Sequence, residues 1–383
     1  MKRVRFRVKK RFFCQFFLTS AVIWLSGCAS LAPEKAEKAA NPLKVAVYAD
    51  GGPSGIGAVE WWRLVHDSPD MELKLVDGAA VRAGALAGQD LLIMPGGSSS
   101  DEFKTLGTNG VEKMKAFIRA GGAYLGTCAG CCLLMDGPQR ACVMPWNKLK
   151  NGSEGDLFFP NFAVNEAGAK ALGIKKGDHK MRYHGGPFMW PTTNVIDGAK
   201  FELWGTFNAQ ACFKGKADPK KAMYGAAGLI GGTYGKGKVF VTAAHPEYFP
   251  ETQYIVRGAI RWLTGRDVAF RLHQRKPGDL AVGYLAKGAN GIKTVETMLA
   301  LSDAPGVCLV PVDADGIWEG RLRYVDVLVV PSVISEKAEG MRKGIQAFQA
   351  RGGKVVTVGR GNANKLKGAV ACPSSNDLME VIR

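Results

Sequence analysis

A cysteine near the middle of the chain sits in a pattern that suits nucleophilic chemistry. Residues 126–130 read Gly-Thr-Cys-Ala-Gly, which has the form of a nucleophile elbow with Cys128 in the place of a serine. In such an elbow a strand turns so sharply into a helix that only glycine fits two residues either side of the nucleophile. A helix N-terminus favours a thiolate, and its backbone N–H groups can hold an oxyanion. The motif alone fits a structural turn with a buried cysteine equally well.

A histidine and a glutamate follow at the end of a predicted strand. Residues 238–244 are apolar and β-branched, and His245-Pro-Glu comes directly after them. A histidine at a strand end can accept the thiol proton, and a carboxylate two residues later can fix its tautomer and support the imidazolium. We therefore predict a catalytic triad in which Cys128 is the nucleophile, His245 is the base and then the acid, and Glu247 is the orienting group.

These motifs resemble class I glutamine-amidotransferase-like domains. Such domains combine a cysteine elbow, a late His-x-Glu and a glycine-bearing loop after an earlier strand, and residues 95–97, Pro-Gly-Gly, match that loop. The resemblance implies oxyanion donors from Gly96 or Gly97 and from Ala129. It also implies thiolate attack on an amide or a related carbonyl, with glutamine as the suggested substrate class.

A closer resemblance is to the N-terminal domain of eukaryotic-type biotin–protein ligases and its stand-alone bacterial relatives. It covers about residues 44–265 and rests on the opening 45–52, on 94–97, on the elbow and on Tyr-His-Gly-Gly-Pro-Phe at 183–188. His184 in the last motif is a candidate for the cleft lining, with a solvated loop histidine as the alternative. The ligase catalytic domain has no counterpart here, so no biotin transfer is expected.

The elements that must position these residues alternate between strand and helix. Strand patterns at residues 44–49, 73–76 and 90–94 are separated by helical ones, and a helix over 112–120 leads into a strand at 123–126. This alternation predicts an α/β fold with a doubly wound, mostly parallel sheet of the flavodoxin-like, glutamine-amidotransferase-like kind. The carboxyl ends of its strands would carry the site.

An internal repeat divides the chain. Residues 48–95 align without a gap when shifted by 236 positions, and Gly121-Gly122 meets Gly352-Gly353 after a five-residue deletion. Cys128 becomes Gly359 in the second copy, and no histidine follows it. The expected domains are an amidotransferase-like domain at 43–265 and a degenerate repeat without catalytic residues at 268–383. The repeat is a candidate surface for an envelope protein partner.

The first residues resemble an export signal. Residues 1–27 hold seven basic and no acidic side chains, and a 14-residue apolar run occupies 12–25, which is typical of a secretory signal. Leu-Ser-Gly-Cys at 25–28 resembles a bacterial lipobox, in which a lipidated cysteine becomes the mature N-terminus. We predict a signal peptide at 1–27, lipid on Cys28, a tether at 28–42 and a membrane-anchored place in the bacterial cell envelope. An ordinary signal peptide with an incidental Cys28 is the alternative.

Composition and spacing exclude several classes of protein. The chain has 383 residues, of which 46% are hydrophobic and 22% charged, a core-forming composition. Seven of the charges behind the net +17 lie in the signal and the others are scattered, so no nucleic-acid partner is expected. The histidines show no metal-ligand spacing with cysteines or carboxylates, so neither a metal nor another cofactor is predicted.

Two pairs of neighbouring residues receive a structural interpretation. Cys131 and Cys132 follow the nucleophile on the expected helix; Cys128-x-x-Cys131 also matches a redox pair, but small core residues are favoured. Trp61 and Trp62 are adjacent and cannot share one helix face, so at most one is expected in the centre of the core.

Two functions from different classes remain open. One is thiol-dependent hydrolysis of a small amide or peptide-like ligand at the Cys-His-Glu site. The other is a non-catalytic envelope binding or scaffold protein that keeps the elbow as inherited architecture.

Overall fold

The computed structural model describes most of the chain apart from the N-terminus and several loops. All described elements belong to one compact unit, residues 35–383. The predicted signal peptide, Cys28 and most of the tether lie outside the described residues. These are 38–50, 55–148, 159–209, 223–270, 275, 277–285, 292–312, 317, 321–331, 339–358 and 366–383.

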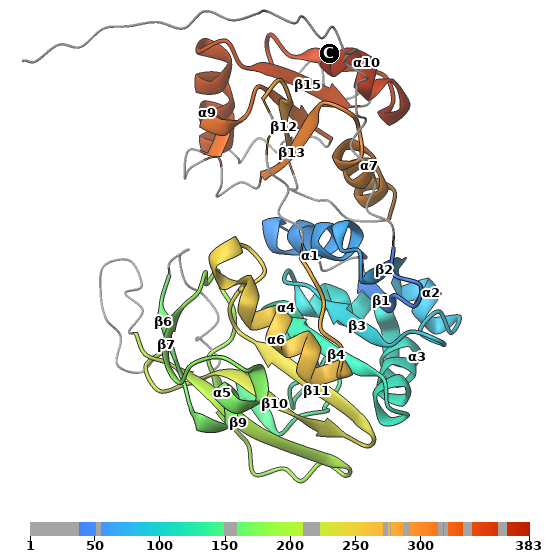
Figure 1. Cartoon of the computed structure of the whole chain (residues 1–383), viewed down its shortest axis with the longest axis vertical. Coiled ribbons are helices and arrows are strands. Elements are labelled where there is room, and N and C mark those ends of the chain that lie inside the picture. Colours follow the sequence, from blue (N-terminus) through green and yellow to red (C-terminus); the bar gives the residue numbers. More distant parts are fainter. Residues whose placement is uncertain are drawn as a thin grey trace, which may run out of the picture. The chain divides into compact units, whose positions relative to one another are not determined.

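Five parallel strands form the centre of the first sheet. Their order is β2-β1-β3-β4-β11, and every neighbouring pair is parallel. Figure 1 shows β1, β3, β4 and β11 side by side, coloured from blue to yellow. The sheet places the C-terminal ends of β4 and β11 next to each other, since Thr127 pairs with Thr242. The bounds are β1 Leu43–Tyr48, β2 Met71–Val76, β3 Leu91–Met94, β4 Ala123–Thr127 and β11 Gly237–Thr242.

Antiparallel strands extend the sheet beyond β11. The order continues β10-β9-β6-β7, and β5 pairs with β8 beside β10. Each of these pairs is antiparallel, which the sequence patterns did not indicate. The bounds are β5 Trp146–Lys148, β6 Asn161–Val164, β7 Gly177–Lys180, β8 Met189–Pro191, β9 Ala199–Phe207 and β10 Ala227–Tyr234.

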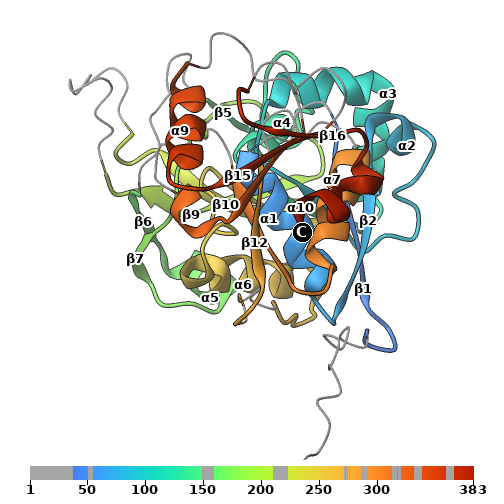
Figure 2. The same cartoon turned by 90° about the horizontal axis from the view of Figure 1, so that it is seen from above.

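Helices cover both faces of the parallel part. The connections β1 to β2 and β3 to β4 run in opposite directions across the sheet, so right-handed crossovers put α1 and α3 on opposite faces. Figure 2 shows α2 and α3 together on one side and α5 and α6 on the other. The bounds are α1 Gly55–Asp67, α2 Gly78–Arg82, α3 Ser99–Arg119, α4 Ala129–Leu134, α5 Glu166–Leu172, the 3-10 turn η2 Pro250–Thr252 and α6 Gln253–Thr264.

A second, all-parallel sheet repeats the first. The order β13-β12-β14-β15 of its first four strands matches β2-β1-β3-β4, and β16 follows β15 as β11 follows β4. The starts of β2 and β13, at residues 71 and 307, are 236 positions apart, and so are those of β3 and β14, at 91 and 327. Gly359, the predicted counterpart of Cys128, lies outside the described residues. The bounds are β12 Leu280–Leu285, α7 Ile292–Ser302, β13 Val307–Val312, η3 Arg321–Tyr324, β14 Val327–Val330, α9 Glu339–Ala350, β15 Lys354–Val358, β16 Val370–Cys372, η5 Ser375–Asp377 and α10 Leu378–Ile382.

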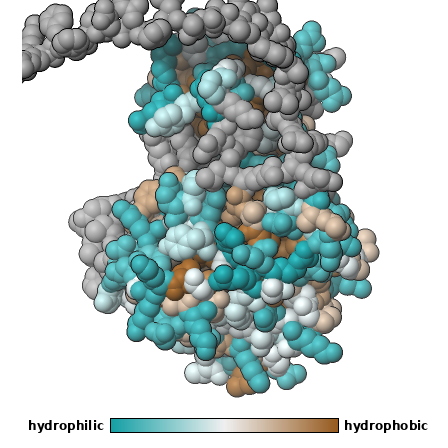
Figure 3. Space-filling model, in the orientation of Figure 1, coloured by the Kyte–Doolittle hydropathy of each residue, from teal (hydrophilic) through white to brown (hydrophobic). Residues whose placement is uncertain are grey.

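The predicted fold class is therefore confirmed: a doubly wound α/β unit is followed by a second, shorter copy. The domain boundary stays a prediction. Helix α6 ends at a left-handed C-cap, Gly265, which is the residue where the first domain was expected to end. Within the described residues, no helix is long and apolar enough to cross a membrane. On the face drawn in Figure 3, hydrophobic residues form small separate patches among hydrophilic ones.

One expectation about the core is wrong. Trp61 and Trp62 are both buried, with 0% and 1% exposure. Helix α1 contacts β1 and β2 as well as α7 and β13, so side chains on two of its faces are covered. A helix that packed against one sheet alone would bury only one of these two adjacent side chains.

Candidate active site

The turn after β4 has the geometry of an elbow. Cys128 takes φ 52° and ψ −102° as the residue before α4, a region that a non-glycine residue adopts only under strain. A Cβ on Gly126 would lie 2.7 Å from the carbonyl of Gly130, and one on Gly130 would lie 2.1 Å from the carbonyl oxygen of Met94. Glycine is thus required on both sides of Cys128, as the motif predicted.

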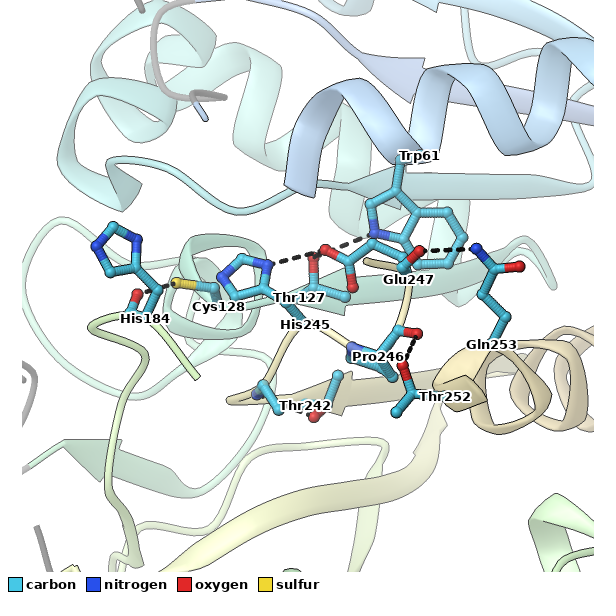
Figure 4. Close-up of polar contacts among 11 residues, drawn as sticks. Trp61, Thr127, Cys128, His184, Thr242, His245, Pro246, Glu247, Thr252 and Gln253 are labelled. Atoms are coloured by element: carbon cyan, nitrogen blue, oxygen red, sulfur yellow. Dashed lines mark hydrogen bonds and ion pairs between the residues drawn. The ribbon is translucent and has the colours of Figure 1, made fainter. Parts of the chain in front are cut away.

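The glycine loop after β3 lies against the cysteine and the histidine together. A Cβ on Gly96 would lie 3.2 Å from Cys128 Cβ, 3.3 Å from His245 Nε2 and 2.5 Å from His245 Cε1. Both side chains therefore border the same small space, which the missing side chain of Gly96 leaves free. Figure 4 shows the Cys128 sulfur between the imidazole of His245 and His184.

Glu247 orients the imidazole of His245. Nδ1 of His245 lies 2.8 Å from Oε1 of Glu247, and the two residues are only 4% and 0% exposed. Because the carboxylate accepts from Nδ1–H, Nε2 is left on the side of Gly96 and Cys128 to accept a proton. The chain thus brings together the three residues of the predicted triad, whose catalytic roles stay predictions.

A second layer of hydrogen bonds holds the glutamate. Thr127 Oγ1 lies 3.5 Å from Glu247 Oε1, and the indole N–H of Trp61 donates to Thr127 Oγ1 at 3.2 Å. The side-chain amide of Gln253 donates to the Glu247 carbonyl at 3.1 Å. All four residues are buried. From the sequence, Trp61 was expected only as a possible core residue, Thr127 only as part of the elbow motif, and Gln253 was not singled out.

The predicted oxyanion and cleft residues lie at the same edge of the sheet. The backbone N–H of Gly97 faces the Cys128 sulfur and favours its charged form, and Ala129 is the first residue of α4. The Cys128 thiol donates to the carbonyl oxygen of His184 at 3.7 Å. His184 is half-buried. Their functions stay predictions.

The resting thiol is not activated. Burial is the main cause that raises the pKa of the Cys128 thiol, while the Gly97 N–H opposes it. Burial outweighs any effect of the helix N-terminus here, because Cys128 is only 7% exposed and α4 spans six residues. Cys128 therefore rests as a neutral thiol.

A buried acid lies behind the elbow. Glu102 in the first turn of α3 is 0% exposed, and neither of its carboxyl oxygens has a hydrogen-bond partner. Burial raises its pKa well above the ordinary value, so it is held neutral. Nothing in the sequence distinguished Glu102 from the solvated acids around it, because its burial depends on how α3 packs.

The other thiols and the surface hollows are not part of the triad. Among the described residues, no group of three or more His, Cys, Asp or Glu is placed to hold a metal ion. Cys131, Cys132 and Cys142 are free thiols like Cys128. Two surface hollows of about 600 and 580 Å³ lie elsewhere, one beside Phe117 and one over α5 and α6, and no triad residue lines either.

Part of the chain matches a known family. Residues 75–134 match the family model described as the N-terminal part of biotin-protein ligase. This span runs from the end of β2 through the glycine loop and the elbow. No curated protein sequence matches the chain.

Several solved structures are similar in fold. A thua-like protein from Bacteroides uniformis has a TM-score of 0.42 at 11% identity, over 61% of this chain and 96% of that one. A cytoplasmic protein of Salmonella typhimurium LT2 has a TM-score of 0.35 at 14% identity, over 58% and 97%. For a β-galactosidase from Rahnella sp. R3 the TM-score is 0.32 at 17% identity, and the match covers 56% of this chain but only 31% of the enzyme. The predicted resemblance is confirmed over residues 75–134, where this chain is similar to the N-terminal part of biotin-protein ligase.

Proposed function

We propose that this chain is an exported, lipid-anchored protein that hydrolyses a small amide or a related carbonyl compound with the Cys128 thiol. The observation that carries the proposal is the orientation of His245. Its Nδ1 is held by Glu247 at 2.8 Å, and its Nε2 borders the same space beside Gly96 as Cys128. A nucleophile, a base and an orienting carboxylate in this arrangement support acyl transfer through a covalent intermediate.

The proposed reaction begins with proton transfer at the moment of attack. Because burial raises the pKa of Cys128, the thiol gives its proton to Nε2 of His245 as the sulfur bonds to the carbonyl carbon. The N–H groups of Gly97 and Ala129 then stabilise the oxyanion of the tetrahedral intermediate. Collapse breaks the C–N bond, and the imidazolium of His245 gives its proton to the departing amine.

Water completes the proposed cycle. His245, neutral again, takes a proton from a water molecule that attacks the thioester carbonyl. The C–S bond breaks, the acid product leaves, and the proton returns to the Cys128 sulfur. Water is the only other reactant in this cycle, so no second organic substrate is required.

A non-catalytic binding or scaffold role is the second candidate. It is favoured by the same burial: Cys128 is 7% exposed and its thiol is neutral at rest. In this role the elbow is structural, and the second sheet serves as the surface for an envelope protein partner. No biotin transfer is proposed in either case.

A screen for hydrolysis of compounds in amide and peptide libraries decides between the enzymatic role and the scaffold role. We expect the wild type to release amine from at least one substrate class, and Cys128→Ala to lose the activity while Cys142→Ala, which removes another free thiol, keeps it. Mass spectrometry should detect an acyl adduct on Cys128. Equal activity in Cys128→Ala, or a folded wild type without turnover on any substrate, would contradict the enzymatic proposal and leave the scaffold role.

A further inference from the structure

A chain of donors runs from helix α1 to the imidazole. Trp61 Nε1 lies 3.2 Å from Thr127 Oγ1, this oxygen lies 3.5 Å from Glu247 Oε1, and Oε1 lies 2.8 Å from His245 Nδ1. The four side chains come from α1, from the end of β4 and from the segment after β11, and all are buried. Figure 4 shows Trp61 and His245 on opposite sides of the Glu247 carboxylate.

The chemistry of the indole fixes the direction of this chain. An indole N–H donates and cannot accept, whereas a threonine hydroxyl does both. Since Trp61 donates to the Thr127 oxygen, the Thr127 hydroxyl proton is free to point at Glu247. Oε1 of Glu247 then accepts hydrogen bonds from two donors, Thr127 and His245.

The neighbouring tryptophan shows that burial alone does not explain the contact. Trp62 is as buried as Trp61, but its indole nitrogen has no hydrogen-bond partner. Burial of an indole therefore does not by itself require a partner in this helix. The second carboxylate oxygen of Glu247 is also buried without a partner among the residues that the structure describes, so it is Oε1 that accepts the hydrogen bonds from Thr127 and His245.

We propose that Trp61 is a positioning residue, which acts through the Thr127 hydroxyl to hold the carboxyl group of Glu247 aligned with His245. This inference deepens the proposed function and rests on it for its catalytic consequence. Neither Trp61 nor Thr127 reaches the reacting atoms; their effect passes through the carboxyl group to the orientation and the tautomer of the imidazole.

Four variants test the chain. Trp61→Phe keeps an aromatic ring and removes the donor, and it should slow site-specific alkylation of Cys128 about 2- to 10-fold at neutral pH. Thr127→Val should slow it about 10-fold or more, since the acceptor is charged. Thr127→Ser keeps the hydroxyl and should stay close to wild type. Trp62→Phe is the matched control and should leave the rate unchanged.

A spectroscopic readout separates positioning from loss of packing. The imidazole Nδ1–H proton, held between His245 and a buried carboxylate, should give a low-field proton NMR signal in the wild type and in Trp62→Phe. The signal should shift or broaden in Trp61→Phe and in Thr127→Val. The double variant Trp61→Phe/Thr127→Val should behave like Thr127→Val alone, because both changes break one chain.

The outcomes distinguish this inference from the proposed function. Equal effects of Trp61→Phe and Trp62→Phe, or loss of the NMR signal in Thr127→Ser, would overturn the positioning role. If His245→Ala alkylates like wild type, the proposed function fails, while the NMR signal still decides the donor chain. Should Trp61→Phe not fold, the Thr127→Ser and Thr127→Val pair decides alone, since these variants differ at the hydroxyl.

Discussion

The Nδ1 atom of His245 lies 2.8 Å from Oε1 of Glu247, and neither side chain is more than 6% exposed. A contact of this kind between residues two positions apart requires a turn directly after β11. The turn brings the glutamate back under the imidazole ring, while the backbone N–H of His245 donates to the Arg182 carbonyl at 2.8 Å. The imidazole is therefore fixed from its backbone and from its ring.

Removal of the charge on Glu247 tests this contact. Glu247→Gln keeps the size of the side chain but can donate to Nδ1, which places the imidazole proton on Nε2. The proton-accepting nitrogen is then turned away from Cys128, so we expect a loss of about 10²–10⁴-fold in turnover. Glu251→Gln, an exposed acid four residues later, should have no effect. Similar rates for wild type and Glu247→Gln would show that Glu247 does not orient the base.

Gly96 offers a test that leaves the triad residues in place. In Gly96→Ala the new methyl would lie 2.5 Å from His245 Cε1, so the ring must move away from Cys128. Displacement of a reacting group by about 1 Å costs about 100-fold in rate, and we expect Cys128 alkylation to fall accordingly. Gly110→Ala, where the nearest atoms are side-chain carbons at 3.2 Å or more, serves as the control. A wild-type alkylation rate in Gly96→Ala would place the imidazole elsewhere.

Glu102 predicts a pH-dependent stability. Burial raises its folded-state pKa well above the ordinary value of 4.5, so the folded chain keeps a proton that the unfolded chain loses. The contribution is full below about pH 4.5 and is lost as pH rises through the folded pKa, by at most about 1.4 kcal/mol per pH unit. Urea unfolding of wild type and Glu102→Gln across this window measures it.

The difference in unfolding free energy between wild type and Glu102→Gln should change with pH in one direction, and another acid on the same helix serves as the control. Glu102→Gln should gain stability relative to wild type as pH rises, and Glu102→Leu should be more stable by about 1–3 kcal/mol, since it removes an unpartnered buried group. Glu112→Gln, with a side chain 55% exposed, should show no pH trend. A wild-type-to-Gln difference that is constant with pH would contradict the buried, neutral acid.

Lipid attachment at Cys28 is a separate proposal. Growth of an expressing bacterium with radiolabelled palmitate should label the wild type and leave Cys28→Ala unlabelled and released from the membrane fraction, because this variant lacks the residue proposed to carry the lipid. Cys14→Ala changes a cysteine within the expected signal peptide and should stay labelled. Label that persists in Cys28→Ala would contradict the lipobox.

The parallel half of the fold follows from local patterns. Strands β2, β3 and β4 coincide within two residues with the segments 73–76, 90–94 and 123–126, because buried parallel strands read as short apolar runs. The repeat predicted the second sheet for the same reason. The antiparallel strands between residues 146 and 234 carry weaker patterns, and their pairing depends on contacts far apart in the chain.

Some residues of the candidate site could likewise be predicted from local patterns, and others could not. Cys128, His245 and Glu247 could be predicted because their motifs are short and contiguous. Trp61 and Glu102 could not, since the hydrogen bond of one and the burial of the other arise only when α1 and α3 pack on the sheet. The raised pKa of Cys128 has the same non-local origin, because burial is its main cause.

The pH dependence of Cys128 alkylation by iodoacetamide, followed by peptide mass spectrometry in wild type and His245→Ala, tests the central claim most directly. If His245 accepts the thiol proton, the wild type should react at neutral pH at least about 10-fold faster than His245→Ala. His245→Ala should react only at alkaline pH, because burial raises the pKa of the Cys128 thiol. His179→Ala should behave as wild type, since His179 contacts Tyr254 away from the triad. Identical pH profiles for wild type and His245→Ala would contradict a base at Cys128.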